Sequence, residues 1–299
     1  MKLRNIKWKG IFCLFLLNVI LSCGGGSSSV IEKTNGDNNG KIRDSFFEVH
    51  LEPLNANEDM FNVLLEFVDS AAQYNIKLTL LFTPQWVEMI LSDADKIDLL
   101  SQWRENGHEV GGHHHGPGVC PWDGYTNLDV NSQEFKNRQN NVPCPESVRE
   151  QEEYLGDMDD YMNLLSNLGS IKTVTMSDAD VDWPEGAVYS AGGRRLIEAI
   201  SEPELVIYNG LEVYKLSSAP LKSEETVLEE LITVDDLKNE YLSEKEGKFG
   251  LNSHAADYKQ NPDLYKEWFE FLNKQDPGMD HAGTISRIVE ESSKSTEEP

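Results

Sequence analysis

The sequence has few cysteines, few basic residues and no long apolar run, and each of these shortages argues against a class of site or partner. Only four cysteines occur among 299 residues. None is spaced as Cys-x-x-Cys, which excludes a thiolate metal site of the zinc-finger type. Lys and Arg number 26 against 52 Asp and Glu, so the formal net charge is −26. Such a chain should repel nucleic acid and anionic membrane surfaces, and we expect no nucleic-acid partner.

The N-terminal segment carries the signals of export. Its apolar stretch, Ile11 to Leu21, is too short to cross a bilayer comfortably and follows four basic residues. We therefore interpret residues 1–22 as a signal peptide. The stretch ends Ile20-Leu21-Ser22-Cys23, which resembles the lipobox of bacterial lipoproteins. That resemblance implies a lipid on Cys23 and a chain anchored in the bilayer of the bacterial cell envelope, at the outer membrane or the cell surface. Plain signal cleavage near Ser22 is the alternative.

Composition divides the exported chain into three parts. Residues 23–41 are rich in Gly, Ser, Asn and Asp and predict a flexible tether. Residues 42–290 have the periodic apolar patterns of one folded domain, and the polar residues 291–299 predict a disordered tail.

The cysteines outside the signal and the lipobox form an even pair. They are Cys120 and Cys144, and in an oxidising compartment such a pair predicts a disulfide. Two free thiols are the alternative.

Apolar runs with strand character alternate with amphipathic segments along the domain. Strands are expected over 46–53 and 77–83, from 109 onward, and over 172–176, 205–208, 211–216 and 248–254. Helices are expected over 58–74, 84–105 with a break near Ser92, 145–168, 224–246, 262–274 and 283–289. This alternation predicts an α/β fold with a parallel sheet or barrel.

The most informative stretch is Gly107-His108-Glu109-Val110-Gly111-Gly112-His113-His114-His115. It holds four of the 7 histidines. Alternate residues of a strand share a face, so His113 and His115 should point one way and His114 the other. Two imidazoles on one face form half of a transition-metal site. A solvated polar loop that contains histidines is the alternative, and we expect His108 to make a structural hydrogen bond.

Further polar residues stand at other predicted strand ends: His50 and Glu52, then Asp178, Asp180 and Asp182, then His254. In a barrel of parallel strands these ends meet at one rim. Metal-assisted hydrolysis needs such a set, because imidazoles and carboxylates hold the ion, a carboxylate takes a proton from water and a histidine protonates the leaving group. The alternatives are packed core histidines, strand-end carboxylates paired with lysine, and loop-forming aspartates.

A polar insertion over 116–144 follows the histidine strand, where α/β folds place their sites. Trp122 and Tyr125 within it either stack on a sugar ring or pack the insertion itself.

The order of these parts resembles the polysaccharide deacetylase family, also called carbohydrate esterase family 4. Gly107 to His113 resembles the family's GHEIGxH segment, and Leu251-Asn252-Ser253-His254 resembles its late-strand motif with the catalytic histidine. The resemblance implies a (β/α) barrel, incomplete or seven-stranded, a divalent metal such as zinc, and a carbohydrate substrate.

The resemblance also implies roles for single residues. His113 and His115, with Glu52 or His50, would hold the metal; the base would be one of Glu52, Asp178 and Asp180, and His254 the acid. His50-Leu51-Glu52 stands where the family has two aspartates, and Pro117 where it has its second metal histidine, so His114 stays an alternative to His115.

Three functions follow from this reading. The first is a lipid-anchored, metal-dependent hydrolase that removes acetyl groups from an N-acetylated glycan. The second is a glycosidase of a related barrel, because His50-Leu51-Glu52 also resembles the His-x-Asp metal pair of α-mannosidase-type enzymes. The third is a catalytically silent surface lipoprotein that binds a glycan or a partner.

Overall fold

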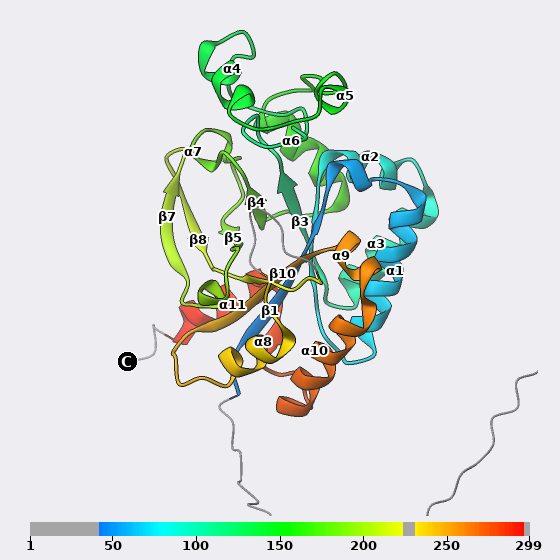
Figure 1. The fold of residues 1–299 in the computed structure, drawn as a ribbon, viewed down its shortest axis with the longest axis vertical. Helices are drawn as coiled ribbons and strands as arrows, with labels where there is room; N and C mark the ends of the chain where they lie inside the picture. The colour runs from blue at the N-terminus through cyan, green and yellow to red at the C-terminus, as the bar shows by residue number, and fades with distance from the viewer. Residues whose placement is uncertain (1–41, 224–230, 296–299) are drawn as a thin grey trace, which may run out of the picture. The chain divides into compact units, whose positions relative to one another are not determined.

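A computed structural model of the protein describes residues 42–223 and 231–295 (Figure 1). The predicted signal peptide, the predicted lipid on Cys23 and the predicted tether lie outside the described residues. Residues 224–230 and 296–299, parts of a predicted helix and of the predicted tail, lie outside them as well. Within the described ranges, no helix combines the length and the apolar character that a membrane crossing requires.

A parallel sheet lies at the centre of the fold. Its main strands stand in the order β4-β3-β2-β1-β10 and are all parallel. They are β1 (Ser45–Leu51), β2 (Thr79–Phe82), β3 (Glu109–His114), β4 (Val174–Met176) and β10 (Lys248–His254). Three short strands complete the sheet: β6 (Ile200–Ser201), β9 (Ala219–Pro220) and β11 (Ala282–Gly283). The predicted α/β class with a parallel sheet is confirmed.

The strands of the main sheet form a curved layer, and a second, smaller sheet continues this curve beyond β4 (Figure 1). Its order is β5-β8-β7, with β5 (Tyr189–Ser190), β7 (Glu204–Tyr208) and β8 (Leu211–Lys215). An isolated parallel bridge between Thr173 and Tyr189 joins it to the β4 segment. The strands form a half-barrel, which confirms the incomplete (β/α) barrel among the predicted forms.

Three helices begin at the residues that the sequence predicts, Glu58, Pro84 and Pro262. The helix α1 (Glu58–Ala72) starts after Asn57, whose side chain accepts a hydrogen bond from the Met60 N–H at 3.1 Å. The predicted break near Ser92 separates α2 (Pro84–Leu91) from α3 (Ala94–Glu105). The other helices are α4 (Gln133–Asn140), α5 (Glu146–Arg149), α6 (Met158–Leu165), α7 (Ala179–Asp182), α8 (Val234–Tyr241), α9 (Ala255–Gln260), α10 (Pro262–Gln275) and α11 (Ile285–Ser295). Short 3-10 turns are η1 (Pro53–Asn55), η2 (Ser166–Leu168) and η3 (Leu196–Glu198).

Three predicted helix boundaries were wrong. In the described residues, the helix expected over 224–246 is only α8, because Thr233 caps a helix that begins at Val234 and ends at Tyr241. The single helix expected over 145–168 is interrupted between α5 and α6, because Asp157 caps a new helix through the N–H groups of Asp159 and Asp160. The tail expected from residue 291 is helical as far as Ser295, where α11 ends, and an ion pair of 2.9 Å between Arg287 and Glu291 supports this extension.

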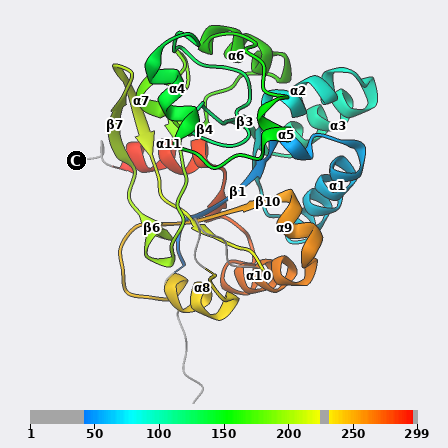
Figure 2. The same cartoon turned by 45° about the horizontal axis from the view of Figure 1, so that its top comes forward.

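The topology brings the carboxyl ends of the central strands to one edge. Parallel strands in one sheet have their C-terminal ends on the same side, so residues that follow β1, β3, β4 and β10 become neighbours. Figures 1 and 2 show α4 of the polar insertion, and α5 directly after the insertion, beyond this end of β3. The edge is therefore both the meeting point of the predicted site residues and the place where the insertion covers the sheet.

His108 lies buried at the start of the histidine segment, and its Nδ1 accepts the predicted structural hydrogen bond, from the Leu78 N–H at 3.0 Å. Burial, with a smaller contribution from Lys77, lowers the pKa of His108 from 6.5 to about 4. The unfolded chain therefore binds this proton at a higher pH than the folded chain. We predict that the free energy of unfolding falls by roughly 3 kcal/mol through this residue as pH drops from 7 to 4.

Urea unfolding of the wild type and of His108→Gln at several pH values tests this prediction. The glutamine amide oxygen can still accept from Leu78 but does not titrate. The wild type should lose stability relative to the variant as pH falls. Parallel pH profiles for the two proteins would contradict the prediction.

Candidate metal centre

The centre is built around the Glu52 carboxylate, directly after β1. The Glu52 carbonyl accepts a hydrogen bond from the Trp86 indole N–H at 3.0 Å. The preceding carbonyl, of Leu51, accepts from the Thr83 hydroxyl at 2.9 Å. Trp86 and Thr83 are fully buried. The start of α2 therefore fixes the backbone from which Glu52 projects.

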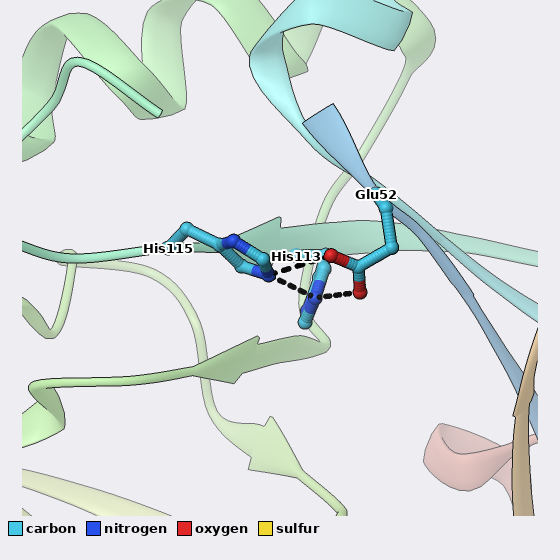
Figure 3. A group of neighbouring side chains, drawn as sticks. All are labelled: Glu52, His113 and His115. Carbon is cyan, nitrogen blue, oxygen red and sulfur yellow. Dashed lines mark hydrogen bonds and ion pairs between the residues drawn. The ribbon is translucent and has the colours of Figure 1, made fainter. Parts of the chain in front are cut away.

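Two histidines of the β3 segment contact this carboxylate (Figure 3). His113 Nε2 lies 3.3 Å from Glu52 Oε1, and His115 Nε2 lies 3.1 Å from Glu52 Oε2. The two Nε2 atoms are 3.0 Å apart. The strand alternation predicted that His113 and His115 share a face, and the structure brings them together with Glu52.

These three side chains suit a bound metal ion. Their ligand atoms all lie within 4.8 Å of one another. Ligands about 2.1 Å from one tetrahedral ion stand about 3.4 Å apart, close to the separations of 3.0–3.3 Å found here. His115 Nδ1 lies 2.9 Å from the Pro121 carbonyl, to which it donates, so the neutral ring presents a lone pair at Nε2. His113 Nδ1, by contrast, is buried with no partner in the described part of the chain.

His254 reaches the same carboxylate from the end of β10. Its Nε2 lies 3.2 Å from Glu52 Oε1, while its Nδ1 lies 2.9 Å from Asp257 Oδ2. Asp257 stands on α9, a six-residue helix that begins directly after His254. Its carboxylate fixes the orientation of the His254 ring. The predicted convergence of His254 with His113 and His115 is thus present in the structure.

His50 lies in the centre but outside the three-residue ligand group. Its ring stacks near His113 and His254, with centroid distances of 4.6 and 5.5 Å. Its Nε2 lies 3.4 Å from Glu48 Oε2. Glu48 lies two residues before His50 on β1, so the two side chains share a face of the strand, and Glu48 is fully buried. The structure therefore groups the ligand atoms of Glu52, and not of His50, with those of His113 and His115.

The charge states of the centre follow from this packing. Burial raises the pKa of Glu52, but His115, His113 and His254 outweigh it and hold that pKa well below the usual value. Burial lowers the pKa of His113 to about 3, so its ring is neutral. Burial also disfavours a charged His254, but its hydrogen bonds with Asp257 and Glu52 raise its pKa to about 10. The centre thus holds one carboxylate that requires a positive partner.

His114 faces the opposite way, as predicted, and is fully buried. Its Nδ1 lies 2.8 Å from Asp123 and its Nε2 lies 3.3 Å from Asp182. Burial opposes protonation, but the two aspartates raise the pKa of His114 to about 9. Asp182 also accepts from the Thr126 hydroxyl at 2.9 Å. This ion cluster fastens the insertion and α7 to β3, so His114 has a structural position.

The predicted alternatives Asp178 and Asp180 do not join the centre. Arg138 of α4 binds both, at 2.7 and 2.9 Å. Asp178 also accepts from the Gly118 N–H at 2.7 Å. These bonds hold the insertion against the end of β4, and they engage both carboxylates. The prediction that either aspartate is the base is therefore not supported.

The insertion packs its own aromatic residues. Trp122 is buried against Phe135, with ring centroids 5.0 Å apart, and donates to the Tyr125 carbonyl at 2.8 Å. Tyr125 is buried beside Tyr161 at 5.8 Å. The packing interpretation of both residues was therefore right, and sugar stacking on them was wrong. The structure also joins the sulfur atoms of Cys120 and Cys144 in a disulfide within the insertion.

The centre opens into a cavity of about 1070 Å³. His50, Glu52, His113, His115 and His254 line it together with Asp257. Neither Asp178 nor Asp180 is among the lining residues. A cavity of this size admits a sugar ring and its neighbours.

Sequence reasoning missed Glu48, Asp257 and Asp123 as partners of histidines, whereas Asp182 belongs to the group of aspartates expected either to bind a metal or to orient a histidine. For Glu48 a signal existed, because Glu48, His50 and Glu52 alternate with the apolar residues Val49 and Leu51 along β1 and directly after it. Asp257 gave none, since its pairing depends on a helix that starts directly after β10. Asp123 depends on how the insertion folds back, which no local pattern determines.

Comparisons with known proteins give the fold. No protein-family model matches the sequence, and no curated protein matches it. Among solved structures, a protein of Mycobacterium smegmatis assigned as a polysaccharide deacetylase superposes with a TM-score of 0.50 at 10% identity, over 86% of this chain and 93% of that one.

Two further structures are less similar. The peptidoglycan deacetylase of Bacillus subtilis gives a TM-score of 0.42 at 12% identity, over 87% of this chain and 96% of that one. The 4-alpha-glucanotransferase of Thermococcus litoralis gives 0.47 at 13% identity, over 82% of this chain and 38% of that one. The likeness to the Mycobacterium smegmatis protein confirms the resemblance stated from sequence at the level of the fold: the chain has the polysaccharide deacetylase fold in a divergent form.

Proposed function

We propose that this protein is a metal-dependent hydrolase that removes acetyl groups from an N-acetylated glycan, and that the lipid on Cys23 anchors it at the bacterial cell surface. One observation carries the proposal. Glu52, His113 and His115 present three ligand atoms within 4.8 Å at the mouth of a large cavity, with His254 in contact with the same carboxylate. The polysaccharide deacetylase fold supports the same reading.

The three ligands would hold a divalent ion, for which we propose zinc, since two imidazoles and a carboxylate with one open position are a common catalytic zinc set. Such an ion would polarise a carbonyl group and lower the pKa of a water molecule.

His254 is the proposed acid. Asp257 holds Nδ1, so Nε2–H faces the cavity beside Glu52 and can donate its proton to a departing amine. His50 is the proposed base, in place of the two aspartates that Arg138 engages. Its ring lines the cavity, and the buried Glu48 carboxylate behind it would stabilise the charged ring that forms when it takes a proton.

The first of two predictions from this proposed function concerns the metal. The full chain, loaded with zinc and dialysed, should retain about one ion per molecule by mass spectrometry. His113→Ala and Glu52→Gln each remove a ligand and should weaken zinc binding at least about a hundredfold, because loss of a group that merely holds a ligand in place already costs about 10- to 100-fold. His281→Ala is the control, since His281 lies half-exposed and pairs with Asp44. Full retention of zinc in both ligand variants would refute this centre.

The second prediction concerns the chemistry. His254→Asn should lower acetate release from chitohexaose by roughly 10² to 10⁴, the usual contribution of a general acid, while zinc content stays unchanged. Asp257→Asn leaves the imidazole but loosens it, so we expect a smaller loss of about tenfold.

The products separate the remaining readings. Acetate release supports the deacetylase, whereas new reducing ends without acetate would indicate the related-barrel glycosidase. A zinc-loaded chain that binds chitohexaose and yields neither product would leave only the binding protein.

A further inference from the structure

The cavity has a second part of its lining that the proposed chemistry does not use. It comes from the segment that follows β5 and from the end of β8, and it includes Arg194, Arg195 and Lys215. Lys215 is aligned with Ser190 in the parallel β5–β8 pair, and Ser190 lines the same cavity. Three cations thus face one cavity in a chain with twice as many acidic as basic residues, 52 against 26.

Within the described residues, two of these cations have no acidic partner. Arg195 pairs with Glu198 at 3.3 Å, and its side chain is 65% exposed. In the ranges that the structure describes, no carboxylate lies within 4.0 Å of the Arg194 guanidinium or the Lys215 ammonium group. Glu204 stands opposite Lys215 in the β7–β8 ladder, yet the two side chains do not form an ion pair.

The carboxylates of the cavity are already engaged. Glu52 contacts three imidazoles, Asp257 binds His254, and Glu198 binds Arg195 and two backbone N–H groups. None of these three carboxylates pairs with the side chain of Arg194 or Lys215, so a negatively charged ligand can bind to both groups.

The backbone that carries Arg194 is fixed. Glu198 accepts from the N–H groups of Arg194 and Arg195 at 2.7 and 2.8 Å. The carbonyl of Gly193 accepts from the buried Asn252 side chain at 2.9 Å. A Cβ at residue 193 would lie 2.0 Å from the Ser218 carbonyl oxygen, so only glycine fits this close approach. The arginine is therefore presented by a rigid turn, which lowers the entropy cost of binding.

An aromatic side chain lies in the same lining. Tyr208 of β7 is half-buried, and its ring lies 5.1 Å from the buried ring of Trp183. A ring held in this way offers an apolar face to a sugar beside the two cations.

We propose that the cavity selects a glycan in which the sugar next to the acetylated residue carries a carboxylate, bound by Arg194 and Lys215. The inference takes its glycan from the proposed function and adds the charge of the substrate. The planar guanidinium matches a carboxylate with two parallel hydrogen bonds, and the ammonium group adds a third. The net charge of −26 acts weakly on such a ligand, because charges beyond about 8 Å are screened at physiological salt.

Calorimetric titration of the full chain with two hexasaccharides tests this proposal. One is N-acetylheparosan, in which glucuronate alternates with N-acetylglucosamine; the other is neutral chitohexaose. The wild type should bind the heparosan fragment at least about tenfold more tightly, the worth of one hydrogen bond to a charged group.

Charge variants locate the preference. Arg194→Gln and Lys215→Gln should each reduce the ratio of the two affinities severalfold, and the double variant should bring it close to one. Arg194→Lys keeps the charge and should keep part of the preference. Lys274→Gln, on the exposed end of α10 and outside the cavity lining, is the matched control and should leave the ratio unchanged. Melting temperatures near that of the wild type show that each variant is folded.

Equal affinity for the two hexasaccharides, no binding of either, or variants that weaken both alike would overturn the proposal. The outcome is independent of the acetate assay. A charge preference without acetate release would contradict the proposed deacetylase and support this inference. Acetate release without a charge preference would support the deacetylase and contradict this inference.

Discussion

The contact of one carboxylate with three imidazoles is the constraint on which the rest of the site depends. Glu52 lies 61 residues from His113 in sequence, and His254 comes from the other end of the domain. They meet because β1 stands between β2 and β10 in a parallel sheet, with β3 next to β2. A buried carboxylate without a positive partner costs several kcal/mol. The imidazoles must therefore share a cation with Glu52, either a proton or a metal ion, and the same carboxylate raises the pKa of His115 against the opposing effect of burial.

The strand pattern carried most of the predictable information. Alternation along β3 separated His113 and His115 from His114, and parallel strands implied that the ends of β1, β3 and β10 meet. These inferences needed only the period of a strand and the rule that parallel carboxyl ends share an edge. The apolar periodicity of α1 and the cap at Asn57 were equally local, which is why the helix was found with its start at the right residue.

The failures were tertiary. Asp178 and Asp180 were expected at the centre because they follow a strand, but α4, 40 residues away, sends Arg138 to both. No spacing in the sequence predicts that Arg138 pairs with these two aspartates. The same holds for His114, whose partners Asp123 and Asp182 come from the insertion and from α7. A charged residue at a strand end was predictable, whereas the neighbour that neutralises it depended on how a long insertion folds back.

Glu48 links the two halves of the cavity and shows why a fully buried acid is tolerated beneath the histidines. It accepts from the Ser218 hydroxyl at 2.7 Å and lies 3.4 Å from His50. Ser218 Oγ in turn accepts from the Asn252 side chain at 2.7 Å.

The other hydrogen of the same Asn252 amide binds the Gly193 carbonyl at 2.9 Å, so one chain of hydrogen bonds runs from the floor below His50 to the turn that presents Arg194. A buried network of this kind is stabilising only when every member is satisfied. Loss of the Glu48 carboxylate would therefore disturb both the histidine centre and the cationic part of the lining. Glu48, Ser218 and Asn252 are therefore all needed to hold the histidine centre and the cationic part of the lining in their relative positions.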